Sequence, residues 1–439
     1  MITLISFLFV LGVLIFVHEL GHFLAARRHG VRVLTFSLGF GPKILKVTRG
    51  DTEYCVSAIP LGGYVKMAGE NPEDPRSGQP DEFLSKTKWQ RFQILFAGPA
   101  MNIILAIVVL AFVLSQGAEM FVYMDQPPVI GAVLPDSPAA QAGIRRGDQI
   151  QTVGGRAVRT WEDLLIEIST RPNRDVGVTL LRDGGPVSTT VRPVGEGKYE
   201  IGNIGVLPDI HPVVDSVIAG DIAEKAGFKS GDIVLAINGE RVITSELFKQ
   251  MVGKTGERDT RFTIQRGDQQ LELRATPKDR GDGAKVGLYI SNPKKSFTPG
   301  PLEAVRMSVE QNIKSSGLIF RTLAGLFTGA TSVRQLQGPV GIAQLSGESA
   351  QEGFIALLSL MAMLSINLGI LNLMPVPVLD GGHILIMALE GIARRDFSMA
   401  VKEKMLLAGF VVLMMLMVTV IYNDLTRISW LERLMPWRN

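Results

Sequence analysis

Residues 1–28 read MITLISFLFVLGVLIFVHELGHFLAARR, and this stretch decides the fold class. Its first 18 residues contain no Asp, Glu, Lys or Arg, and apolar residues continue as far as residue 26, just before two arginines. A helix needs roughly 20 apolar residues to cross the hydrocarbon core of a bilayer. The stretch therefore predicts a membrane-spanning helix.

Three further uncharged runs, residues 92–118, 353–379 and 405–423, are of similar length. Only 20% of the residues are charged, whereas soluble proteins carry about 25%. The net charge of +3 provides no electrostatic basis for binding nucleic acid. The single cysteine, Cys55, excludes intrachain disulfides and zinc sites built from cysteines. We therefore predict a polytopic α-helical membrane protein with four transmembrane helices.

The basic residues predict how the chain is oriented. Eleven Lys and Arg residues lie between residues 27 and 91, and four more lie between 391 and 404. Connections rich in Lys and Arg stay in the cytoplasm. We therefore expect the 119–352 region and both termini on the external side of the membrane.

The external region contains an internal repeat. Residues 133–158 (VLPDSPAAQAGIRRGDQIQTVGGRAV) align without a gap with residues 217–242 (VIAGDIAEKAGFKSGDIVLAINGERV), with 8 of 26 positions identical and a constant shift of 84. Each copy predicts a short helix ended by Ala-Gly, a Gly-Asp turn, a strand and a glycine hairpin turn.

The repeated pattern A-G-[IF]-x-x-G-D-x-[IV] resembles bacterial PDZ domains. Such domains bind extended chain ends by adding a strand to a sheet edge. The alternative is that these copies are spacers whose grooves stay empty. After them, apolar residues recur at helical spacing between 302 and 328. They predict an amphipathic helix that lies on the membrane surface or docks on the second repeat.

Residues 18–22 of the first predicted helix read HELGH. Positions i and i+4 share one helix face, so His18 and His22 can hold one zinc ion together, with Glu19 placed to take a proton from an activated water. A glutamate inside a spanning helix marks a functional site. The alternative is a buried polar cluster without a metal.

A catalytic zinc needs a third protein ligand, and Asp380 is the best candidate. It ends the 353–379 run, which Pro375 and Pro377 interrupt. Prolines at membrane depth break a helix, and the freed backbone is tolerated only inside protein or along a wet cavity. His383 is the second candidate for this position.

HELGH together with NLMPVPVLDGG (372–382) resembles the site-2 protease family of intramembrane zinc metalloproteases. Two PDZ-like domains between the second and third helices make the chain similar to the RseP-type bacterial branch. The resemblance extends over the chain through four further motifs, which are SLGFGP (37–42), YCVSAIPLGGYVKM (54–67), FAGPAMN (96–102) and GPVGIA (338–343).

This resemblance implies a set of site residues. It implies one zinc ion per chain on His18, His22 and Asp380, and Glu19 as the catalytic base. It implies that Asn372 and Asn102 face the substrate, although from the residues alone each could make helix–helix contacts instead. It also implies a re-entrant, membrane-associated β-hairpin, matched by Gly62, Gly63 and Tyr64.

The residues themselves offer a role for that hairpin. Residues 52–67 predict two β-like segments with Gly62 and Gly63 as the turn. An exposed edge there could hold an unwound substrate extended beside the zinc. The alternative is an ordinary cytoplasmic hairpin.

The activity implied by the family is hydrolysis of transmembrane segments in single-span membrane proteins that another protease has trimmed. In the RseP-type branch the usual substrates are anti-sigma factors, and remnant signal peptides are also cut. The resemblance also implies a bacterial cytoplasmic (inner) membrane, with the active site towards the cytoplasm. The alternatives are a zinc peptidase acting on soluble or loop substrates, a non-enzymatic membrane PDZ scaffold or chaperone, and a zinc transporter, for which four spans and one histidine pair make a poor path. The external domains could recruit substrates or exclude bulky ones, and we favour exclusion.

The expected organisation runs as follows: a first transmembrane helix (1–27), a cytoplasmic loop with the hairpin (28–91), a second transmembrane helix (92–118), two PDZ-like domains (119–205 and 206–292), a linker with an amphipathic helix (293–352), a third transmembrane segment (353–391), a cytoplasmic loop (392–404), a fourth transmembrane helix (405–424) and an external tail (425–439).

Overall fold

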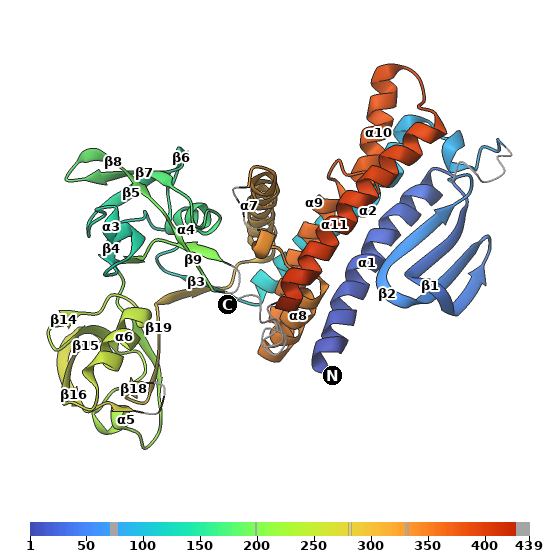
Figure 1. The fold of residues 1–439 in the computed structure, drawn as a ribbon. Helices are drawn as coiled ribbons and strands as arrows, with labels where there is room; N and C mark the ends of the chain where they lie inside the picture. Colours follow the sequence, from blue (N-terminus) through green and yellow to red (C-terminus); the bar gives the residue numbers. More distant parts are fainter. Residues whose placement is uncertain are drawn as a thin grey trace. The chain divides into compact units, whose positions relative to one another are not determined.

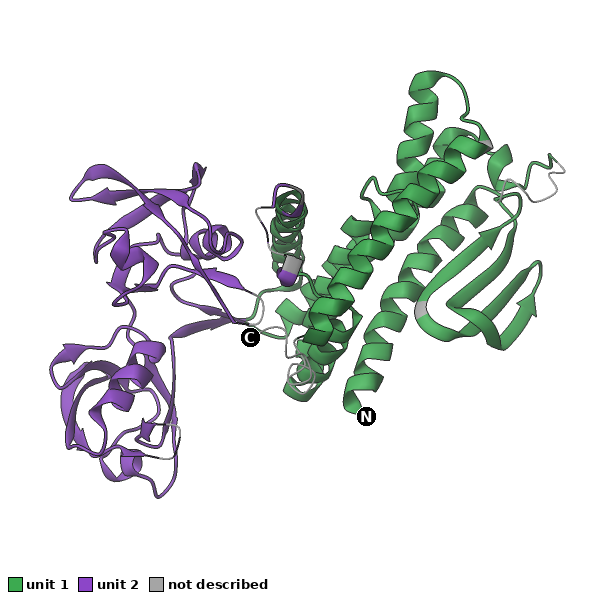
Figure 2. Ribbon diagram, in the orientation of Figure 1, with its two compact units in different colours: residues 1–118, 298–325, 336–439 green, residues 119–297, 326–335 purple. Residues whose placement is uncertain are grey.

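The computed structural model of the chain describes residues 1–70, 78–197, 200–279, 281, 283–329, 331 and 333–426. The chain forms two compact units (Figure 2). The helical unit comprises Met1–Ala118, Thr298–Gly325 and Leu336–Asn439, and the β-rich unit comprises Glu119–Phe297 and Leu326–Gln335. The external tail expected from 425 lies outside the described residues beyond 426.

Four helices of the helical unit are long and apolar enough to cross a membrane, which confirms the predicted four spans. They are α1 (Ile2–Arg28), α2 (Lys88–Ser115), α9 (Phe354–Asn372) and α11 (Met399–Thr426). Helix α2 begins four residues before its uncharged run, because Thr87 and Gln90 form a capping box at its N-terminus. The third predicted segment is not one helix: α9 ends at Asn372, and a separate helix, α10 (Asp380–Ala393), follows.

Two further helices of this unit pack beside the spans (Figure 1). The amphipathic helix predicted from 302 to 328 is α7 (Pro301–Phe327). It packs on α2, where the Ser308 hydroxyl donates to the Ile107 carbonyl at 2.8 Å. Helix α8 (Pro339–Glu352) packs on α1, and the Asp424 carboxylate of α11 accepts hydrogen bonds from the amides at its N-terminus, Gly338 and Gly341.

The long hairpin beside α1 is built differently from its prediction (Figure 1). Strands β1 (Val33–Arg49) and β2 (Thr52–Met67) pair antiparallel, and the chain reverses between Arg49 and Thr52. Gly62 and Gly63 therefore lie inside a strand and not at the turn, because the partner of residues 52–67 is the preceding segment.

The β-rich unit contains two domains of similar construction. In the first, the sheet order is β6-β5-β7-β8, and β4 pairs with β11. In the second, the order is β16-β15-β13-β12-β19, with β14 on β13. Each domain has its own buried apolar core, with Trp161 and Leu164 in the first and Phe248 and Phe262 in the second.

The elements of the first domain are β4 (Ile130–Val133), α3 (Pro138–Gln141), β5 (Gln149–Val153), β6 (Arg156–Ala157), α4 (Trp161–Ser169), β7 (Val176–Arg182), β8 (Gly185–Val191), β9 (Val194–Glu196), β10 (Ile201–Asn203) and β11 (Val206–Pro208). Those of the second are β12 (Val213–Val217), α5 (Ile222–Lys225), β13 (Ile233–Ile237), β14 (Glu240–Arg241), α6 (Ser245–Thr255), β15 (Thr260–Arg266), β16 (Gln269–Ala275), β17 (Lys278–Asp279), β18 (Ala284–Lys285) and β19 (Leu288–Ser291). Strands β3 (Ala118–Phe121) and β20 (Lys294–Phe297) pair with each other. Because β11 pairs with β4, the first domain reaches past the boundary expected at 205.

The 84-residue shift found in the sequence continues through both domains. Strands β7 and β15 begin 84 residues apart, as do β8 and β16, beyond the aligned stretch. An ion pair repeats with the same shift. Arg182 donates to Asp148 at 2.8 and 2.7 Å and to the Gly143 carbonyl at 2.7 Å. In the second domain Arg266 makes the same contacts with Asp232 and the Gly227 carbonyl.

The Asp148–Arg182 pair predicts how the first domain responds to acid. The hydrogen bonds from Arg182 hold the pKa of the buried Asp148 carboxyl below its usual value. The pair therefore stabilises the domain fully above about pH 4, and this contribution is lost as the pH falls through the lowered pKa. We expect Asp148→Asn to accelerate amide hydrogen exchange across 130–208 on the order of 100-fold at pH 6.

The exposed pair Asp175–Arg192 provides the matched control. Its two hydrogen bonds are equally short, at 2.7 Å, but both side chains are more than half exposed. Asp175→Asn should change exchange by less than about threefold, because water screens exposed ion pairs. Equal acceleration of hydrogen exchange by the two variants would contradict the prediction. So would an acceleration by Asp148→Asn that is as large at pH 3 as at pH 6.

Candidate metal centre and active site

Helix α1 brings two histidines of HELGH to one point. His18 and His22 lie one turn apart, and their Nε2 atoms are 3.2 Å from each other. His22 is buried, and Glu19 between them is also buried. The i, i+4 spacing predicted this convergence.

Asp380 reaches the same point from the other end of the chain. Residues 373–379, which include Pro375 and Pro377, interrupt the helical structure between α9 and α10, so that Asp380 begins α10. One of its carboxylate oxygens, Oδ2, lies 3.3 Å from His18 Nε2 and 3.4 Å from His22 Nε2. His383, the second candidate, is not part of this cluster.

The segment before Asp380 is strained and tightly packed. Val378 has a φ of 96°, an outlier for a β-branched residue. A Cβ atom on Gly381 or Gly382 would lie 2.3 or 2.2 Å from a backbone carbonyl oxygen of the interrupted segment. The Asp-Gly-Gly sequence therefore allows the first turn of α10 to fold back closely on residues 373–376.

The far end of α10 is held by a buried carboxylate. Glu390 lies 2.7 Å from Lys402 of α11 and 3.9 Å from Lys88 of α2, and it accepts a hydrogen bond from the Phe397 amide at 2.9 Å. A buried charge needs such partners. This cluster fixes the helix that carries Asp380 to two neighbouring helices.

The three donor atoms fit a zinc ion. Their separations of 3.2, 3.3 and 3.4 Å form a nearly equilateral triangle. Tetrahedral zinc with ligands at 2.0–2.1 Å has ligand–ligand edges of about 3.4 Å. Two imidazoles and one carboxylate are also a donor set that zinc accepts in catalytic sites, where the fourth position stays open. The cluster of His18, His22 and Asp380 can therefore bind a metal ion.

Helix α2 contacts the outer nitrogens of both histidines. His22 Nδ1 lies 2.8 Å from the Ile94 carbonyl oxygen, to which it donates, and this leaves Nε2 free to bind a metal. His18 Nδ1 lies 3.2 Å from the Asn102 amide. The two helices meet closely at glycine: a Cβ on Gly98 would lie 2.2 Å from His22 Nε2.

A cavity of about 390 Å³ adjoins the metal ligands. Glu19 and Asn372 line it, as do Gly62, Gly63 and Tyr64 of β2. The two glycines permit a close approach, since a Cβ on Gly63 would lie 2.9 Å from Glu19 Cγ, and a Cβ on Gly62 would strike the Phe40 ring. The cavity thus gathers five of the expected site residues beside the ligands.

Asn102 is placed differently from that expectation. It is completely buried and does not line the cavity; its side chain lies against His18. Sequence reasoning also missed the Ile94 carbonyl, for which a side-chain pattern gives no signal, and Glu70 and Val378, which line the cavity.

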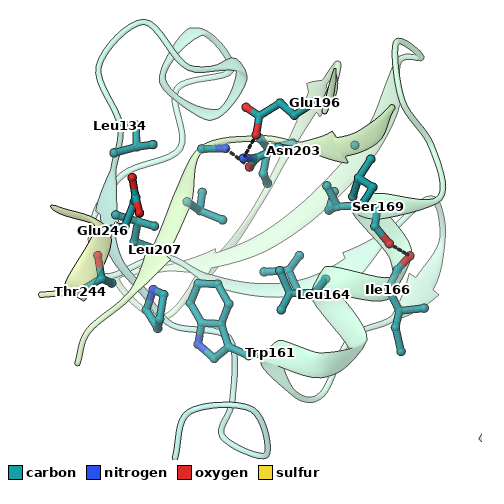
Figure 3. Close-up of a pocket in the computed structure, with 18 of the residues that line it drawn as sticks. Leu134, Trp161, Leu164, Ile166, Ser169, Glu196, Asn203, Leu207, Thr244 and Glu246 are labelled. Carbon is teal, nitrogen blue, oxygen red and sulfur yellow. Dashed lines mark hydrogen bonds between the residues drawn. The ribbon is translucent and has the colours of Figure 1, made fainter. Parts of the chain in front are cut away.

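A second cavity, of about 740 Å³, lies in the β-rich unit (Figure 3). It runs between α4 and the segment that leads into β11, with Trp161 and Leu164 on one side and Asn203 and Glu196 on the other. Strand β11 has β4 on one edge and, among the described strands, none on the other. The first domain therefore has an apolar groove beside an open strand edge, as expected of a PDZ-like domain.

Comparisons with known proteins agree with this geometry. The model of peptidase family M50 matches residues 6–416. Protease RseP of Yersinia pestis is 34% identical over 452 residues, covering 97% of this chain and 99% of its own. The regulator of sigma E protease of Haemophilus influenzae is 34% identical (96% and 98% covered), and regulator of sigma-E protease RseP of Escherichia coli K12 is 32% identical (97% and 98%).

Among solved structures, a PDZ domain of an SdrC-like protein from Listeria monocytogenes matches 19% of this chain and 90% of its own, at 16% identity and a TM-score of 0.17. We therefore describe the fold of the two repeats from their own strand order and not from this match.

The donor triangle predicts a specific pattern of zinc content. Protein purified with its zinc should contain about one ion per chain, and His22→Ala and Asp380→Ala should each lose at least roughly 90% of it, because a third ligand is required. Glu19→Gln and His383→Ala should keep theirs. Elemental analysis of the four variants measures this. Retention by Asp380→Ala together with loss by His383→Ala would move the third ligand to His383.

Proposed function

Because the chain belongs to peptidase family M50 and is an RseP-type site-2 intramembrane zinc metalloprotease, we propose that it cleaves the transmembrane segments of single-span membrane proteins after their external parts have been trimmed. The observation that carries the proposal is the triangle of His18, His22 and Asp380 donor atoms beside Glu19, at the edge of a cavity inside the helical unit.

We assign the zinc to His18, His22 and Asp380. When bound, zinc polarises a peptide carbonyl and makes water a stronger acid. Glu19 then acts as the base: it takes a proton from the attacking water and delivers it to the leaving amine. Glu19 lines the cavity without belonging to the donor triangle, which suits a residue that moves protons.

Asn372 provides a further polar group in the cavity. It ends α9, next to the interrupted segment, and it lines the cavity with Asp380. Its amide can donate a hydrogen bond to the oxygen on which negative charge develops, or to substrate backbone. Either contact would favour an extended substrate near the metal ligands.

Strand β2 offers a way to hold such a substrate. A helix hides its peptide bonds, so a transmembrane substrate must unwind before water can reach them. Residues 63–65 of β2 line the cavity and pair with β1 on one edge only. An unwound segment can therefore add to the other edge as a third strand, with its peptide bonds exposed beside Glu19.

The depth of the site supports the proposed orientation. His22 lies six residues before Arg28, which ends α1, and its partner Ile94 lies six residues after Lys88, which begins α2. Basic residues favour the cytoplasmic side. We propose that the active site faces the cytoplasmic half of the inner membrane and that the β-rich unit is external.

We propose anti-sigma factors as one substrate class, with remnant signal peptides as another. The support is the similarity to relatives named as regulators of sigma E. The groove of the first PDZ-like domain would accept an extended apolar peptide, since Leu164, Leu165 and Ile201 are among its lining residues. The bulk of the two domains would exclude untrimmed proteins from the active site.

The catalytic assignment predicts separate effects on metal and turnover. Glu19→Gln should reduce cleavage of a single-span substrate in nanodiscs by at least about 1,000-fold, because the proton transfer is lost while the ligands remain. His383→Ala is the control and should cleave within about threefold of the wild type. Gel analysis of cleavage and elemental analysis of zinc together measure this; appreciable cleavage by Glu19→Gln would refute its role. Comparable cleavage of an unstructured soluble peptide by the wild type would favour a peptidase that acts on loops.

Deletion of residues 127–292 tests exclusion by size. If the domains act by bulk, the deleted protein should cleave both untrimmed and trimmed forms of a substrate, the latter about as fast as before. If the domains recruit substrate, the same deletion should slow cleavage of the trimmed form. The measurement is the ratio of the two cleavage rates, with zinc content confirming an intact site. A zinc-loaded deletion variant that still refuses the untrimmed substrate would contradict exclusion.

A further inference from the structure

The contact between Asn102 and His18 pairs two nitrogen atoms in a way that does not suit metal binding by His18. The two nearest atoms are both nitrogens, the amide Nδ2 and the imidazole Nδ1, at 3.2 Å. An amide nitrogen only donates, so His18 Nδ1 would have to accept and the imidazole proton would sit on Nε2. Yet Nε2 is the atom that faces His22 and Asp380, and a protonated nitrogen cannot bind a metal.

The amide oxygen of Asn102 is also without a hydrogen-bond donor in the described part of the chain. This atom, Oδ1, is buried. Leaving a buried acceptor unpaired costs about 1–3 kcal/mol. A half-turn of the Asn102 amide exchanges its oxygen and nitrogen within the same volume. The oxygen then faces His18 Nδ1, accepts its proton as a hydrogen bond, and leaves Nε2 free. This one rotation therefore gives Asn102 Oδ1 a hydrogen-bond partner and leaves His18 Nε2 without a proton.

His22 shows the same arrangement without any rotation. Its Nδ1 donates to the Ile94 carbonyl oxygen at 2.8 Å, and its Nε2 faces Asp380. Ile94 and Asn102 are eight residues apart on α2, and therefore share one helix face with Gly98 between them. A backbone carbonyl of α2 therefore fixes the orientation of the His22 ring, whereas the orientation of the His18 ring depends on the Asn102 side chain.

Contacts with α9 and complete burial fix the position of Asn102 beside His18. The Asn102 backbone carbonyl accepts a hydrogen bond from the Ser365 hydroxyl of α9 at 2.7 Å, and its side chain is fully buried. It lies outside the cavity, so it has no contact with a substrate there. We infer that Asn102 is a positioning residue: its amide oxygen accepts the Nδ1 proton of His18 and so directs the Nε2 lone pair of His18 to the metal.

This inference rests on the ligand set of the proposed function, and the experiment separates the two. The full-length protein in nanodiscs is titrated with zinc against a chelator of known affinity. Asn102→Leu has a similar shape but no acceptor, and we expect it to bind zinc 10- to 100-fold more weakly, as is typical when a partner of a ligating histidine is lost. Asn102→Asp keeps the acceptor and should remain within about threefold of the wild type.

Asn312 provides the matched control. It is another buried asparagine of the helical unit, bonded to the Ser308 carbonyl of its own helix at 2.8 Å, and Asn312→Leu should leave zinc affinity within about threefold. Wild-type affinity in Asn102→Leu, or equal loss in Asn102→Asp and Asn102→Leu, overturns the inference. Absence of zinc binding by the wild type itself would refute the ligand set.

A measurement on the wild type keeps the inference testable if Asn102→Leu does not fold. Nitrogen-15 spectra of histidine-labelled, zinc-free protein report which imidazole nitrogen carries the proton, and His18→Gln identifies the signal. We expect a proton on His18 Nδ1. An Nδ1 without a proton, with the imidazole proton on Nε2 alone, overturns the inference, because Asn102 would then be the donor.

Discussion

The proposed metal ligands lie inside an apolar helix bundle, and the hydrogen bonds that this location demands constrain the rest of the helical unit. Water is scarce there, so each imidazole nitrogen that does not face the metal must find a partner within the protein. Helix α2 supplies these partners to α1, and the two helices approach closely enough because Gly98 of α2 and Gly21 of α1 have no side chains. Zinc chemistry in the membrane thus depends on helix packing as much as on the ligands.

The same constraint explains where regular structure is interrupted. Residues 373–379 leave the helical conformation at the point where Asp380 must turn toward α1, and Val378 holds a strained backbone there. Strand β2 approaches α1 through Gly63. Irregular backbone at membrane depth is tolerated when protein or a cavity surrounds it, and both segments line the cavity that holds Glu19. Glu19 and the non-helical backbone therefore occur together at this cavity.

The β-rich unit is stabilised by apolar cores and ion pairs of its own. Its two domains have independent apolar cores and repeat the same Arg–Asp pair at the same shift of 84 residues. These pairs anchor the turn after the short helix to β7 in the first domain and to β15 in the second. Duplication has therefore preserved a structural pair, while the lining of the first groove also includes Thr244 and Glu246 of the second domain.

Local patterns in the sequence determined much of the molecule. Long uncharged runs established four spans, because the thickness of the bilayer sets the length of an apolar helix. The gap-free repeat established two similar domains, and the spacing of His18 and His22 established a shared helix face, since both depend on neighbours in the chain. Asp380 was found because prolines at membrane depth mark a break, which is also a local signal.

Contacts between distant segments were decided only by the tertiary structure. The partner of β2 is the preceding segment 33–49, so the glycines expected at a turn lie in a strand, where they relieve a steric clash with α1 and Phe40. Asn102 supports His18 instead of lining the cavity, and a backbone carbonyl supports His22. No residue pattern encodes such pairings, because they depend on which helix faces meet and on how closely they approach.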